Sequence, residues 1–162
     1  MSMTLVQTVT VTSNVVSINF NSIPQDADDL YITLSARGNS TTEAERFVSL
    51  WMNTGFDFGP SGSRSLRGNG SSVSSIQQFY GLSNLSNTTA NTFSNNSIYI
   101  PNYKSSVNKS VSWDAVSENN ATLAEQWISA GTYSLTSAIT ALMLYGNFVA
   151  GTTASLYKIT KA

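Results

Sequence analysis

The chain contains neither cysteine nor histidine in its 162 residues. Without cysteine it can form no disulfide and no thiolate metal site, and this composition fits synthesis in a reducing cytoplasm. Without histidine it lacks the commonest general base. The two absences together also remove the Ser-His and Cys-His nucleophile pairs and the usual zinc and iron ligands. We therefore expect a protein that is not an enzyme and that needs no cofactor or metal.

Charged side chains are also scarce. They make up 10% of the residues, with a net charge of -1, against about 25% in typical soluble domains. The basic residues are scattered from Arg37 to Lys161, whereas a nucleic-acid surface needs them clustered. No apolar run approaches the roughly 18 residues that cross a bilayer, and the N-terminus has no basic or apolar leader region. We expect no nucleic-acid partner, no membrane segment and no signal peptide.

Short neutral polar residues, mainly Ser, Thr and Asn, take the place of the charges, and apolar residues alternate with them at a period of two. This alternation predicts half-buried strands. The segment Phe47–Met52 has apolar residues at both phases, which indicates a central strand, and Ser74–Leu82 fits either a strand or a short helix. The other expected strands are Val9–Val11, Val16–Phe20, Leu30–Ala36, a short one at Ser65–Leu66, Thr92–Ile100, Lys109–Ser117, Glu125–Ala130, Ile139–Tyr145 and Thr153–Ile159.

Eight to ten evenly spaced strands without a long amphipathic helix indicate an all-β protein. We expect one domain over residues 1–162, an antiparallel β-sandwich of jelly-roll type. Glycine and serine are enriched from Asn53 to Ser72, which predicts one long irregular loop. Loops of this length in compact domains are usually functional or lie at an interface.

A glycosidase needs two carboxyl groups close together, one of them raised in pKa by burial. The acidic residues with apolar neighbours are Asp114, after Trp113, and Glu125, before Gln126 and Trp127. The competing interpretation puts both carboxylates on the solvated face of their strands, opposite the tryptophans. We favour that second interpretation.

The acidic residues Asp26, Asp28 and Asp29 form the one dense acidic cluster of the sequence. Such a loop could hold calcium, but the EF-hand pattern and a distal Glu are missing. A turn in which the Asp side chains satisfy their own backbone is the alternative that we favour. The segment Gly68–Ser72 lacks the Lys-Ser/Thr ending and the following helix of a phosphate loop, so we interpret it as a turn.

The aromatic residues admit two interpretations. The three tryptophans and seven tyrosines could form a stacking platform for sugars. Trp113, however, is in phase with Val111 and Ala115, which predicts that it lies in the core. Phe56 and Phe58 lie in the Gly-rich loop, where exposed aromatic side chains are typical anchors for a partner surface.

Several segments near the two ends of the chain form a recognisable combination. They are Val16–Pro24, Asp29–Ile32 with the Arg37 that ends the strand, Thr136–Thr140, Gly146–Thr152 and Ala154–Ile159. Taken together, these segments resemble a group of small structural proteins of tailed bacteriophages. The middle of the chain matches that group poorly.

The resemblance implies a virion component on the capsid surface, made in the host cytoplasm. It implies a capsid decoration (cement) protein that forms a homotrimer and contacts the major capsid protein. The alternative is a tail-fibre or receptor-binding module that recognises a host glycan. Because termini and long loops can adapt to a partner, we expect contacts from an N-terminal arm over residues 1–5, with Met1, Met3 and Leu5, and from Phe56 and Phe58.

Overall fold

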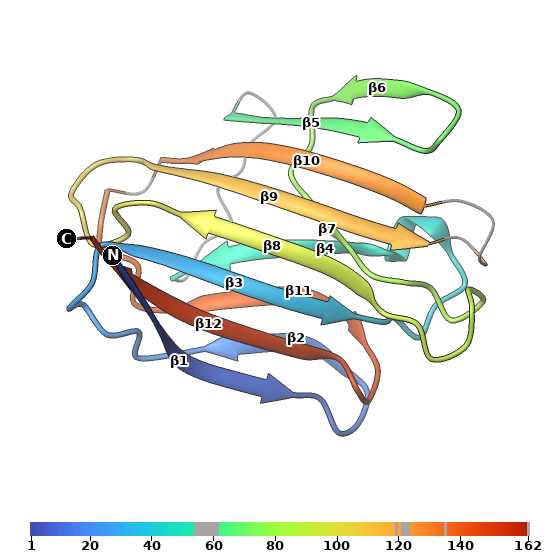
Figure 1. Ribbon diagram of the computed structural model, residues 1–162, viewed down its shortest axis with the longest axis horizontal. Coiled ribbons are helices and arrows are strands. Elements are labelled where there is room, and N and C mark those ends of the chain that lie inside the picture. Colours follow the sequence, from blue (N-terminus) through green and yellow to red (C-terminus); the bar gives the residue numbers. More distant parts are fainter. Residues whose placement is uncertain (54–61, 119, 121–123, 135, 162) are drawn as a thin grey trace.

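The computed structural model describes residues 1–53, 62–118, 120, 124–134 and 136–161. In this part of the chain, strands make up almost all of the regular structure (Figure 1). The elements are β1 (Ser2–Thr10), β2 (Val15–Phe20), β3 (Asp29–Ala36), a 3-10 turn η1 (Glu43–Glu45), β4 (Phe47–Met52), β5 (Ser63–Gly68), β6 (Val73–Ile76), β7 (Gly81–Leu82), β8 (Ser94–Ile100), β9 (Lys109–Glu118), β10 (Ala124–Tyr133), β11 (Leu142–Phe148) and β12 (Thr153–Thr160).

The strands form two antiparallel sheets that pack face to face. The larger sheet has eight strands in the order β1-β12-β3-β8-β9-β10-β5-β6, and the smaller has four in the order β2-β11-β4-β7. Figure 1 shows the larger sheet in front of the smaller one. The predicted all-β sandwich is thus confirmed, and Phe47–Met52 is central, as expected. The jelly-roll type is not confirmed by this strand order.

The core lies between the two sheets and follows from the alternation in the sequence, because successive side chains of a strand point to opposite faces. In β3 the side chains of Leu30, Ile32, Leu34 and Ala36 are all buried. Trp113 is 1% exposed, as its phase predicted. Burial of a large apolar side chain contributes about 1.5–3 kcal/mol, so this core accounts for most of the driving force for folding.

The segment Ser74–Leu82 is divided between two sheets. Its first part belongs to β6, at the edge of the larger sheet, and its last two residues form β7 in the smaller sheet. Asn96, fully buried, fixes this crossing. Its Oδ1 accepts hydrogen bonds from the Leu82 backbone N–H at 3.0 Å and from the Trp113 indole at 3.1 Å. One buried amide thereby joins β7 to β8 and β9.

The polar stretch from Ser83 to Asn91 is held by Arg37 at the end of β3. The Arg37 guanidinium donates hydrogen bonds to the backbone carbonyls of Ser86, Thr88, Thr89 and Thr92 at 2.9–3.3 Å. Five donors in a fixed fork make arginine suited to this task. The guanidinium group of Arg37 therefore holds this loop in place by binding its carbonyl oxygens.

The N-terminal residues do not form the free arm that we expected. Residues Ser2 to Leu5 lie in β1 and pair with β12, in the register Met3 opposite Ile159 and Leu5 opposite Tyr157. Pairing with β12 gives the backbone N–H and C=O groups of this segment hydrogen-bond partners along one side, and this favours its place in the sheet over a free arm. Phe56 and Phe58, the other predicted contact residues, lie outside the described residues.

Candidate functional site

The larger sheet turns one face away from the core, and we call this the outer face. A cross-strand row runs over it from Leu5 through Tyr157 and Tyr31 to Tyr99, each residue directly opposite the next. Neighbouring strands lie about 4.8 Å apart. The row therefore sets three tyrosines side by side on β12, β3 and β8, and all three are half-buried.

Large apolar side chains are exposed on the outer face at both ends of the sheet. Met3 and Leu5 on β1 are 55% and 53% exposed. At the other end Ile128 and Leu66 lie directly opposite one another and are 52% and 54% exposed, and Val73 on β6 is 79% exposed. The outer face thus carries two separate apolar groups, one at each end of the sheet, and each is a candidate contact site.

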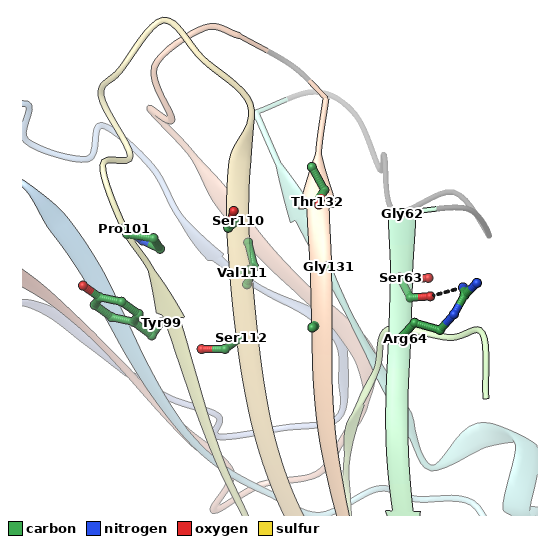
Figure 2. A pocket seen from close by; sticks show the side chains of 11 residues that line it. Gly62, Ser63, Arg64, Tyr99, Pro101, Ser110, Val111, Ser112, Gly131 and Thr132 are labelled. Atoms are coloured by element: carbon green, nitrogen blue, oxygen red, sulfur yellow. Dashed lines mark hydrogen bonds between the residues drawn. The ribbon is translucent and has the colours of Figure 1, made fainter. Parts of the chain in front are cut away.

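A hollow of about 490 Å³ lies on this face where β8, β9, β10 and β5 run side by side (Figure 2). Apolar atoms make up more of its lining than polar atoms do. The residues that line it include Ser110, Ser112, Thr132, Tyr99 and Arg64. Hydroxyl groups and an aromatic ring can bind a neutral polar ligand such as a sugar.

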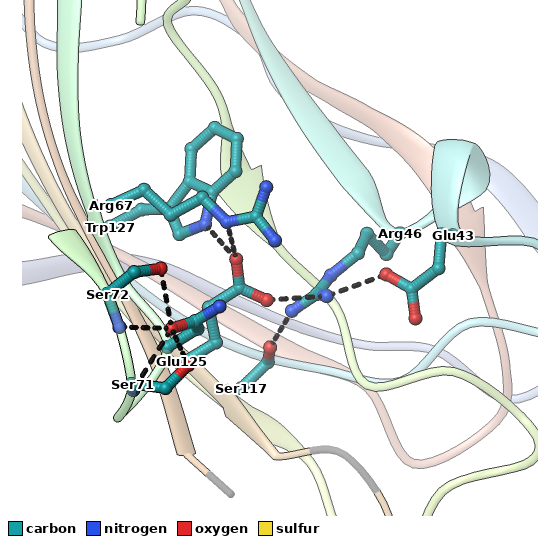
Figure 3. Close-up of polar contacts among 9 residues, drawn as sticks. Glu43, Arg46, Arg67, Ser71, Ser72, Ser117, Glu125 and Trp127 are labelled. Carbon is teal, nitrogen blue, oxygen red and sulfur yellow. Dashed lines mark hydrogen bonds and ion pairs between the residues drawn. The ribbon is translucent and has the colours of Figure 1, made fainter. Parts of the chain in front are cut away.

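A second cluster lies at the opposite end of β10, around Glu125 (Figure 3). The Glu125 carboxylate is 10% exposed and forms ion pairs with Arg46 at 2.7 Å and with the Arg67 Nε at 2.5 Å. Its Oε1 also accepts a hydrogen bond from the Trp127 indole at 2.7 Å. Arg46 in turn binds Glu43 at 2.8 Å and the Ser117 hydroxyl.

This cluster corrects the interpretation of Glu125. We expected Glu125 on the solvated face, opposite Trp127, but both side chains point inward and are buried. The reason is that residues i and i+2 of a strand share a face. The expectation holds for Asp114, which is exposed on the other side of β9 from Trp113. The two candidate carboxylates therefore lie on opposite faces and do not form a glycosidase pair.

Both oxygens of Glu125 are engaged by cations or by the indole, so the cluster stabilises the structure. It ties β4 and η1 to β10 through Arg46, and β5 to β10 through Arg67. The Arg67 guanidinium also lies 5.7 Å from the centre of the Trp127 ring, a geometry that adds a cation–π attraction. A buried carboxylate is tolerated when it is paired and hydrogen-bonded in this way.

The acidic cluster before β3 is neutralised by lysines. Asp26 pairs with Lys158 at 2.6 Å and Asp28 with Lys104 at 3.7 Å. Among the described residues no group of His, Cys, Asp or Glu is arranged to hold a metal ion. We expected the Asp side chains to satisfy the backbone of their own turn. This is wrong for Asp28 and Asp29, whose carboxylates accept the backbone N–H groups of Lys161 at 2.8 Å and of Asn102 at 2.9 Å, both in other segments.

Asp29 is the buried member of this cluster, at 1% exposure. It accepts hydrogen bonds from the Tyr99 hydroxyl at 2.6 Å, the Asn102 backbone N–H at 2.9 Å and Lys161 at 2.9 Å. Burial raises the pKa of Asp29, but these three donors outweigh burial and leave the pKa below its usual value. Asp29 thus holds the C-terminal residues and the end of β8 to the start of β3.

This pKa shift predicts a loss of stability in acid. The pKa of Asp29 is lower in the folded than in the unfolded chain, where it is about 3.9. Its contribution is therefore fully present above about pH 4 and is lost as the pH falls through the folded pKa. Urea unfolding between neutral and acid pH should show a steeper decline for the wild type than for Asp29→Asn. Equal slopes for the wild type and Asp29→Asn would contradict the assignment.

The described residues contain no helix long and apolar enough to cross a membrane. Comparison of the chain with protein-family models, with curated proteins and with solved structures found no match.

Proposed function

We propose that this protein is a structural component of a bacteriophage virion, specifically a capsid decoration (cement) protein without catalytic activity. It stabilises the shell through contacts with the major capsid protein and with copies of itself. The observation that carries this proposal is the outer face of the larger sheet. This face is broad, has few charged side chains and exposes several large apolar side chains. The resemblance of both chain ends to phage structural proteins supports the same conclusion.

The size of the outer face suits such a contact. Eight strands at spacings of about 4.8 Å give a width of about 34 Å, and β8, with seven residues, is about 23 Å long. These dimensions approach the roughly 800 Å² that a standard interface covers on each partner. The charged groups on it, such as Asp114 and Arg64, are few, and burial therefore costs little desolvation of ions. Repeated over many copies, contacts of this size would hold a shell together.

The proposal is tested on particles purified from the source of the chain. Stoichiometric amounts of the protein should be found in them by quantitative mass spectrometry, and particles that lack it would refute the proposal. Ile128→Glu should then reduce rebinding of the purified protein to stripped particles, because it places a charge in the outer face. Tyr145→Glu is the matched control, since Tyr145 is 49% exposed but lies on the smaller sheet.

One observation favours the alternative, a tail-fibre or receptor-binding module for a host glycan. The row of Tyr157, Tyr31 and Tyr99 leads to the hydroxyl-lined hollow of Figure 2, and aromatic rings beside hydroxyl groups suit a sugar. A glycan array, followed by calorimetric titration of any hit against the wild type and Tyr157→Ala, decides this. A flat response on the array removes the alternative.

A further inference from the structure

The two sheets have their open edges on the same side of the molecule. β1 is the first strand of the larger sheet and β2 the first of the smaller one, and only residues 11–14 separate them in the chain. Figure 1 shows both strands along the lower border of the sandwich. We call this side, formed by Ser2–Thr10 and Val15–Phe20, the double edge.

The double edge lacks two of the usual protections of edge strands, charged side chains and proline. Natural proteins place Lys or Pro on such strands, or keep them short, so that other chains cannot pair with their free backbone groups. The first 25 residues of this chain contain no charged side chain, and the first proline is Pro24. Leu5 on β1 and Val16 on β2 are instead 53% and 57% exposed.

The opposite borders of the two sheets are built differently. The larger sheet ends in β6, of four residues, and the smaller in β7, of two. β1, by contrast, has nine residues. A register shift between Leu5 and Gln7 interrupts β1, but strand pairing with β12 continues on both sides of it. Within the described part of the chain β1 pairs with β12 alone, so its two extended halves present unpaired N–H and C=O groups at the border of the larger sheet.

We propose that the double edge binds the double edge of a second copy of this chain, with β1 antiparallel to β1 and β2 facing β2 across a two-fold axis. The larger sheets of the two copies then join into one continuous sheet. Exposed Met3 and Leu5 become neighbours of the partner's strand on the outer face. The free backbone groups of β1 gain hydrogen bonds.

A second copy fits this side better than a single strand from another protein. A partner that covers both edges at once must offer two strands about 10 Å apart, the spacing of packed sheets. A second copy offers two such strands, its own β1 and β2, at the same spacing, because they are the edges of the same pair of packed sheets. A two-fold contact places residue i of one copy against residue j of the other and residue j against residue i, and residues 2–20 have no side-chain charges to repel one another.

This pairing does not depend on the virion proposal, because it concerns the purified chain in solution. It predicts a two-fold dimer where the phage resemblance implies a trimer. A monomer in solution would overturn the pairing and leave the capsid proposal standing, whereas absence from particles would do the reverse.

The experiment measures the mass of the full chain by sedimentation velocity over a range of concentrations. The wild type should sediment as a dimer in which the two β1 strands pair about their middle residue, Val6. Leu5→Lys should sediment as a monomer, because position 5 lies next to that middle residue and the contact would set two lysines close together. Leu66→Lys is the matched control: Leu66 is equally exposed on the same face but lies on β5, and this variant should remain a dimer. Circular dichroism checks that each variant is folded.

A mixing experiment then identifies β1 as the contact on both copies. Equimolar Leu5→Lys and Leu5→Glu should restore the dimer, since opposite charges meet only if β1 faces β1. In the wild type, amide exchange in β1 should also slow with rising concentration. A monomeric wild type, a dimer that survives Leu5→Lys, dissociation by Leu66→Lys, or failure of the mixture to recover the dimer would each overturn the proposal.

Discussion

Glu125→Ala should lower the free energy of unfolding by about 3–5 kcal/mol, the usual cost of removing one partner from a buried ion pair. The variant leaves Arg46 buried, at 6% exposure, with Glu43 as its remaining carboxylate partner. It also removes the acceptor of the Trp127 indole and the carboxylate that holds Arg67. Urea unfolding followed by circular dichroism measures the loss.

The control for Glu125 is Asp114→Ala on the neighbouring strand. Asp114 is exposed, and its contact is a long hydrogen bond from Gln126 at 3.3 Å. This substitution should change the free energy of unfolding by less than about 0.5 kcal/mol, as is typical of surface positions. Equal effects for the two variants would show that the Glu125 cluster contributes nothing beyond an exposed carboxylate.

Gly81→Ala should be as damaging, for a steric reason. A Cβ at Gly81 would lie 2.0 Å from the Trp113 Cζ2 atom and 2.6 Å from the Asn96 Oδ1 atom. Neither neighbour can yield easily, because Trp113 is buried and its indole is bonded to the same Asn96 oxygen. Overpacking usually costs about 1–3 kcal/mol and occasionally more, and we expect a loss of about 3 kcal/mol or more here.

Two measurements check the effect of Gly81→Ala. Thermal unfolding reports the loss of stability, and the near-ultraviolet circular dichroism of the tryptophans reports the displacement of Trp113. Gly68→Ala is the matched control, since a Cβ at Gly68 would meet nothing within 4 Å. It should lie within about 0.5 kcal/mol of the wild type. A Gly81→Ala protein as stable as the control would show that β7 can move away from Trp113.

Local patterns in the sequence predicted β3, β4, β8 and β9 well, because a period of two is a property of the strand alone, but they missed most of β1 and ended β11 before Gly146. The alternation in β3 and the phase of Trp113 gave the correct buried face. The same rule, applied consistently, would also have placed Glu125 beside Trp127. The sequence favours an exposed Glu125, because burying a carboxylate costs free energy unless cations pair with it. The cations that do so, Arg46 and Arg67, lie far from Glu125 in the chain.

The sequence by itself determined that this protein is a β-sandwich poor in charge, without histidine or cysteine. Only the tertiary structure decided which strands are edges, that residues 2–5 join the sheet, and that uncharged β1 and β2 share one open side. Strand order depends on pairings between distant segments, and these are fixed by the joint packing of two sheets. The candidate outer face and the double edge both arise from that order.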